Sequence, residues 1–160
     1  MDEHHDDILT LMPTGLVELV LEHWQATQPR HETIAMLEEV IKFLYLVSKY
    51  KDELEGKFFP LSKDADDIWH FLIIQTREYY ELCNNLPGHR FIHHRSISFL
   101  DYSAKKQDRQ QVVRELLLFI PYYVKEFQGF IDSRARHWKI ISLLLEEKHM
   151  TLSQVNGLVV

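Results

Sequence analysis

The stretch from residue 32 to residue 50 constrains the fold most, because its apolar residues recur every three or four positions. Ile34, Leu37, Ile41 and Leu44 share one face of a helix with this spacing, and further apolar residues widen that face. We therefore expect a long and largely buried helix. Its remaining polar positions are Glu32, Glu38, Glu39, Lys42 and Lys49.

Few helix-breaking residues interrupt the rest of the chain. Its 160 residues include only five Gly and five Pro, which favours long helices over a turn-rich β architecture. We predict an all-α fold, a single-domain helical bundle of about five helices over residues 11–160, after a flexible acidic tail at 1–10. The expected helices cover residues 14–27, 32–50 and 63–84, and Ser62 caps the third. A fourth helix begins at about Ala104 and is kinked at Pro121, and a fifth begins at Asp132 or Ser133. Thr151 caps a last short turn.

Composition and charge exclude several classes of protein. The net charge of −6 argues against a nucleic-acid-binding surface, and no apolar run approaches the roughly 18 residues of a membrane span. The acidic N-terminus lacks the features of a signal peptide, and a single cysteine permits no internal disulfide. We expect a cytoplasmic protein, although export without an N-terminal signal stays open. The motifs of phosphate loops, nucleophile elbows and zinc proteases are absent from the sequence.

A group of carboxylate and imidazole side chains marks the candidate site. Asp66 and His70 are four residues apart on a predicted helix, so they project from one face on adjacent turns. His93 and His94 follow a tight turn at Pro87–Gly88, where the chain can fold back toward that face. Two histidines and one carboxylate form the ligand set of many Fe(II) sites, and zinc sites use similar donors.

Two functions fit these residues. In the first, the protein binds Zn or Fe through Asp66, His70 and His93, with His94 as a fourth ligand or a general base, and acts on a small molecule. In the second, the same side chains form a structural polar network in a non-catalytic module, which binds a protein partner through the aromatic Tyr122–Tyr123 region.

Three further side chains in this segment are candidates for substrate binding. Arg77 could bind an anion, although an ion pair with Glu81 at i+4 is the simpler expectation. Tyr79 could present its hydroxyl to a pocket or pack in the core. Cys83 could act as a soft ligand or nucleophile, although burial near the end of a helix would leave its thiol inert.

The run PLSKDADDIWHFLIIQTREYYELC, followed by GHRFIHH, resembles the glycine-rich domain-containing-protein-like family. The similarity lies between positions 60 and 94, and Asp-x-x-Trp-His is its most distinctive part. This resemblance implies a shared metal or small-ligand site but no particular reaction. The matching positions are Pro60, Ser62, Asp66, Trp69, His70, Thr76, Arg77, Tyr79, Cys83, Gly88, Ile92, His93 and His94.

Overall fold

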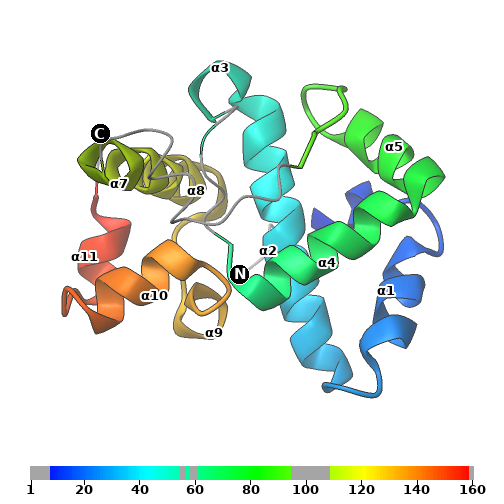
Figure 1. The fold of residues 1–160 in the computed structure, drawn as a ribbon, viewed down its shortest axis with the longest axis horizontal. Coiled ribbons are helices and arrows are strands. Elements are labelled where there is room, and N and C mark those ends of the chain that lie inside the picture. Colours follow the sequence, from blue (N-terminus) through cyan, green and yellow to red (C-terminus); the bar gives the residue numbers. More distant parts are fainter. Residues whose placement is uncertain (1–7, 55–56, 58–60, 95–108, 159–160) are drawn as a thin grey trace.

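The fold is built around one long central helix, α2. The computed structural model describes residues 8–54, 57, 61–94 and 109–158. Within these ranges it contains helices and no β-strand, which confirms the all-α class, and one isolated β-bridge joins Leu61 to Trp138. Figure 1 shows α2 (Arg30–Lys49) between two groups of helices. One group includes α1 (Leu16–Trp24) and α4 (Lys63–Ile74), and the other includes α8 (Phe119–Phe127) and α9 (Asp132–Ala135).

Shorter elements complete the arrangement. The 3-10 helix η1 begins at Ile8, inside the stretch expected to be a tail, and Ile8 is buried where η1 packs against α2. Residues 1–7 and the expected helix start at Ala104 lie outside the described residues. No helix in the described part of the chain combines the length and apolarity that crossing a bilayer requires. The remaining elements are η1 (Ile8–Leu11), α3 (Lys51–Leu54), α5 (Thr76–Asn85), α7 (Arg109–Leu117), α10 (Lys139–Glu146) and α11 (Leu152–Asn156).

Helix α2 is buried on all sides over most of its length. From Met36 to Val47 every residue except Tyr45 is buried, including the charged Glu39 and Lys42. The expected polar side of this helix therefore lies in the interior there, because other helices cover both of its flanks. Burial of this kind requires that the charged groups be paired with one another.

The helix expected over residues 63–84 is divided in two at Gln75. Ser62 caps α4 as expected and accepts a hydrogen bond from the backbone N–H of Ala65 at 3.3 Å. At Gln75 the backbone leaves the helical region (φ −82°, ψ 64°), and α5 begins at the next residue. In an unbroken helix, residues 69 and 79 would lie about 15 Å apart along the axis. The break instead lets α5 turn back, so that Tyr79 contacts Trp69.

The helix expected to be kinked at Pro121 is split just before the proline. The break lies at Leu118, between α7 and α8, and Pro121 is in the first turn of α8. A backbone N–H there has no acceptor within the helix, so proline fits without losing a hydrogen bond. The fifth expected helix is also divided, into α9 and α10. Because three expected helices are divided, the described helices are shorter and more numerous than the five predicted.

Candidate metal centre

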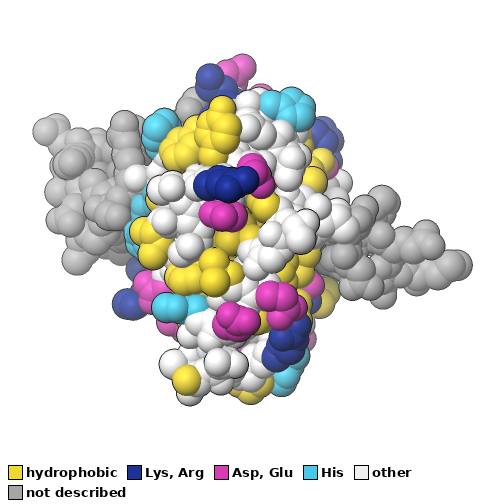
Figure 2. Space-filling model, turned by 90° about the vertical axis from the view of Figure 1, so that its right-hand side faces the viewer, with side chains coloured by type: hydrophobic (Ala, Val, Ile, Leu, Met, Phe, Trp, Pro, Cys, Tyr) yellow, Lys and Arg dark blue, Asp and Glu magenta, His cyan; other side chains and the backbone are white. Residues whose placement is uncertain are grey.

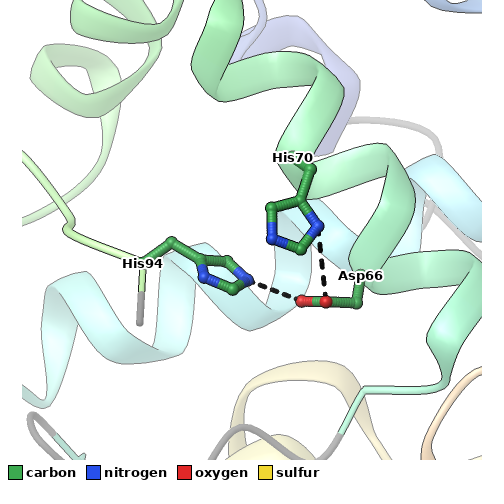
Figure 3. A group of neighbouring side chains, drawn as sticks. All are labelled: Asp66, His70 and His94. Carbon is green, nitrogen blue, oxygen red and sulfur yellow. Dashed lines mark hydrogen bonds and ion pairs between the residues drawn. The ribbon is translucent and has the colours of Figure 1, made fainter. Parts of the chain in front are cut away.

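Two of the site residues are placed by the first two turns of α4. The start of this helix is held by the backbone N–H of Ser62, which donates to the carbonyl of His137 at 2.8 Å. Asp66 and His70 then project from one face on adjacent turns, as their spacing predicts. The atoms Asp66 Oδ2 and His70 Nδ1 lie 3.4 Å apart (Figure 3).

The segment after α5 is fastened to the C-terminal end of α2. The backbone N–H of Gly88 donates to Ser48 Oγ at 2.8 Å, and Arg90 Nη2 donates to the carbonyl of Val47 at 2.8 Å. A Cβ atom at position 88 would lie only 2.5 Å from the carbonyl oxygen of Ser48, so only glycine fits this approach. These contacts make the chain fold back after the Pro87–Gly88 turn, as the sequence suggested.

Tyr79 holds the returning segment against α4. Its hydroxyl donates to the carbonyl of Ile92 at 2.6 Å and accepts from Trp69 Nε1 at 3.0 Å. Burial raises the pKa of Tyr79 well above its usual range, so the hydroxyl stays protonated and can donate. The ring of Trp69 in turn contacts the ring of His94, with 4.2 Å between centroids. Through Trp69 and the returning segment, Tyr79 therefore helps to position the imidazole of His94.

His94 completes a group of three potential metal ligands. Its Nε2 and Asp66 Oδ1 form a hydrogen bond of 2.7 Å, and its ring lies 4.2 Å from the ring of His70 (Figure 3). One donor atom from each of Asp66, His70 and His94 lies within 4.8 Å of the others. The side chain of His94 is 7% exposed, that of Asp66 31% and that of His70 44%. One edge of the group is thus buried, and the other faces solvent.

The separations fit a metal site after small movements. Ligand atoms about 2.0–2.2 Å from one zinc ion lie roughly 3.0–3.5 Å from each other in tetrahedral or octahedral geometry. His70 Nδ1 already lies at this separation, 3.4 Å, from Asp66 Oδ2. His94 Nε2 lies 2.7 Å from the other carboxylate oxygen, Oδ1, so binding of one ion would open this pair by a few tenths of an ångström and turn the carboxylate. Side-chain rotation at the half-exposed His70 can supply the remaining adjustment.

His93 does not join this group. Its side chain is exposed, and its ring packs edge-on against Phe91 with 4.8 Å between centroids. Burial alternates along this segment, with Ile92 and His94 facing inward and their neighbours outward, as side chains do in an extended chain. Of the histidine pair, His94 and not His93 therefore lies beside Asp66.

The other candidate residues lie apart from the three ligands. Arg77 is 86% exposed, and its Nε lies 3.9 Å from Glu81 Oε1, which is the i+4 pairing expected from the sequence. Cys83 is buried, and burial raises the pKa of its thiol, so it has the character of an inert core residue. Tyr79 has its hydroxyl bonded inside the protein and acts as a support rather than as a wall of a pocket.

The sequence interpretation missed a second group of polar residues, around Glu39. The Glu39 carboxylate accepts hydrogen bonds from Lys42 Nζ at 2.8 Å, Tyr123 Oη at 2.7 Å and Trp138 Nε1 at 2.8 Å. Arg134 Nη1 lies 3.9 Å from the same carboxylate. A signal was present, since apolar residues surround positions 39 and 42 on every side of the helix, and charged residues there must be buried.

Comparisons with protein-family models, curated proteins and solved structures found no match to this chain. The resemblance to the glycine-rich domain-containing-protein-like family therefore stays a prediction that rests on the residues between positions 60 and 94.

Removing the Tyr79 hydroxyl tests its supporting role. Tyr79→Phe leaves the Ile92 carbonyl and the Trp69 N–H without this buried partner, so we expect the free energy of unfolding to fall by about 1–3 kcal/mol. Chemical denaturation measures this change. The control is Tyr80→Phe, because Tyr80 is 58% exposed and should change stability by less than about 0.5 kcal/mol. Equal effects of the two substitutions would show that the buried hydroxyl supports nothing.

Proposed function

We propose that this protein binds a divalent transition metal ion, Zn or Fe(II), through Asp66, His70 and His94. The observation that carries the proposal is the convergence of these three side chains from two separate segments, with donor atoms within 4.8 Å of one another. Imidazole and carboxylate donors suit both metals. The hydrogen bonds of Tyr79 and the turn at Gly88 support the proposal further, because they hold the second segment in place.

We further propose that the site is of the catalytic kind. Three protein ligands leave at least one coordination position for water or substrate, whereas structural zinc sites are closed by four protein ligands. The open side of the group carries the half-exposed His70, so a small molecule could approach from solvent. A metal in such a position lowers the pKa of bound water and polarises oxygen atoms of a substrate. This geometry supports a reaction in which the bound metal acts on a small polar molecule.

A structural polar network is the second candidate function, and the 2.7 Å hydrogen bond between Asp66 and His94 favours it. Such a bond fastens the returning segment to α4 without any metal. The expected partner surface at Tyr122–Tyr123 is wrong, however, because Tyr123 is buried and Tyr122 packs on Tyr50.

Among the described residues, the face drawn in Figure 2 presents no continuous hydrophobic surface in place of that one. On the face at the right of Figure 1, hydrophobic side chains form separate patches with charged side chains between them (Figure 2). The two most exposed large hydrophobic residues in the described part of the chain are Ile74 at 69% and Tyr80 at 58%. We therefore favour metal binding over a protein-docking role.

Metal content separates the two functions. We expect the protein, after incubation with zinc and gel filtration, to retain about one zinc per chain by elemental analysis, and His94→Ala to retain far less. His93→Ala is the matched control, because it removes the neighbouring imidazole, which is exposed and lies apart from the group. Retention below about 0.1 zinc per chain in the unmodified protein would favour the structural network.

A further inference from the structure

The junction between the C-terminal helices and the start of α4 contains a buried histidine, His137. Its backbone carbonyl accepts the Ser62 N–H at 2.8 Å, and the following residue, Trp138, forms the β-bridge with Leu61. Figure 1 shows the turn between α9 and α10 beside the beginning of α4. His137 is only 6% exposed, so its imidazole is buried at this junction, where the backbone carbonyl of the same residue holds the start of α4.

The ring of His137 lacks one hydrogen bond. Its buried Nε2 has no hydrogen-bond partner among the residues that the structure describes. A neutral imidazole can leave Nε2 as a bare acceptor, whereas a protonated imidazole carries an N–H on both nitrogens. Protonation would therefore bury a donor without an acceptor, which is more costly than an unused lone pair.

The charges around the ring come from three elements. Arg134 in α9 and Arg136 just after it oppose a positive charge on His137, while Glu39 in α2 and Asp64 in α4 favour one. Glu39 is weakened as a partner of His137, since it already accepts bonds from Lys42, Tyr123 and Trp138. Desolvation by burial is the main cause that holds the pKa of His137 below its usual range, and the positive charges of Arg136 and Arg134 add to it.

We propose that His137 is an acid-sensitive lock, which joins the start of α4 to the turn between α9 and α10 while its imidazole is neutral. Protonation weakens this junction, because a charged imidazole buried there has no acceptor among the described residues for its second N–H. The proposal does not rest on the proposed metal site, because none of the three ligands takes part in the junction, and it is tested in the metal-free protein.

The direction of the pH effect follows from proton linkage. Histidine in an unfolded chain titrates near pH 6.5, and the folded chain binds its proton on His137 only at lower pH. Above about pH 6.5 the ring is neutral in both states and leaves stability unchanged. As the pH falls below that value, the unfolded chain takes up the proton first, so the folded state loses stability.

The test compares the pH dependence of thermal unfolding in metal-free protein. We expect the Tm of the unmodified protein to fall between pH 7.5 and pH 5.5 by at least about 2 °C more than that of His137→Phe, which cannot titrate. His31→Phe is the control, because His31 is an exposed histidine at the start of α2 and its loss should leave the pH dependence unchanged. Equal pH dependence in the unmodified protein and His137→Phe would overturn the proposal.

A second measurement decides the matter without any substitution that must fold. Histidine ring signals in the NMR spectrum of the unmodified, metal-free protein report each titration midpoint. We expect the His137 ring to titrate below the pH of about 6.5 that is usual for histidine, or to stay neutral until the protein unfolds. A midpoint at or above pH 6.5 in the folded protein would overturn the proposal, whatever the stability of His137→Phe.

Discussion

Glu39→Ala is expected to lower the free energy of unfolding by about 3–5 kcal/mol, because it removes the acceptor at the centre of a buried network. The carboxylate of Glu39 is fully buried and accepts from Lys42, Tyr123 and Trp138. Without it, the buried Lys42 ammonium loses its ion pair, and the hydroxyl and indole N–H lose their acceptor. Chemical denaturation monitored by circular dichroism measures the loss.

Two further variants make this result specific. Glu22→Ala removes an exposed glutamate from α1 and should change stability by less than about 0.5 kcal/mol. Adding Lys42→Met to Glu39→Gln should recover part of the stability that Glu39→Gln loses, because the second change removes a buried charge that no longer faces the Glu39 carboxylate. A loss below about 1 kcal/mol for Glu39→Ala would contradict the account of the core.

Zinc is expected to stabilise the folded protein strongly. At a free zinc concentration one hundred times the dissociation constant, a site present only in the folded state adds about 2.7 kcal/mol of stability. For a chain of this length, that corresponds to a rise in Tm of about 5–11 °C. The rise should vanish in Asp66→Ala and His94→Ala, which lack a ligand, and on addition of a chelator.

The control for zinc stabilisation is again the neighbouring histidine. His93→Ala should keep the full rise in Tm, because the side chain of His93 is exposed beside Phe91. Each variant is compared with itself with and without zinc, so that any loss of stability from the substitution cancels. The same small rise in all four proteins would indicate zinc binding at scattered surface residues instead of at this site.

Local patterns in the sequence predict much of the fold. The apolar spacing around Leu37 and Leu44 predicts the central helix α2, and Ser62 predicts where α4 begins. The turn at Pro87–Gly88 is also predicted, since both residues end helices by their backbone preferences. These features depend on a few neighbouring residues, so a sequence pattern is enough to find them.

Features that depend on contacts between distant segments are not predictable in this way. The break at Gln75 is marked by neither glycine nor proline, and it forms where Tyr79 turns back to contact Trp69. The choice between His93 and His94 depends on which side of the returning segment faces α4. The hydrogen bond from Tyr79 to the segment, the packing of His94 against Trp69 and the hydrogen bond between His94 and Asp66 fix that orientation.

The buried charges illustrate the same limit. Glu39 and Lys42 occupy polar positions of α2, and they are buried because helices from the far end of the chain cover them. Tyr123 and Trp138 supply the hydrogen bonds that make their burial possible. Periodicity within one helix carries no information about such partners.

The most direct test of the metal centre is a crystal of the protein grown with zinc and measured on both sides of the zinc absorption edge. We predict one strong anomalous peak about 2.0–2.2 Å from a carboxylate oxygen of Asp66 and from one ring nitrogen each of His70 and His94. No peak at that position in zinc-soaked crystals, with these side chains in their present hydrogen-bonded arrangement, would contradict the proposed function.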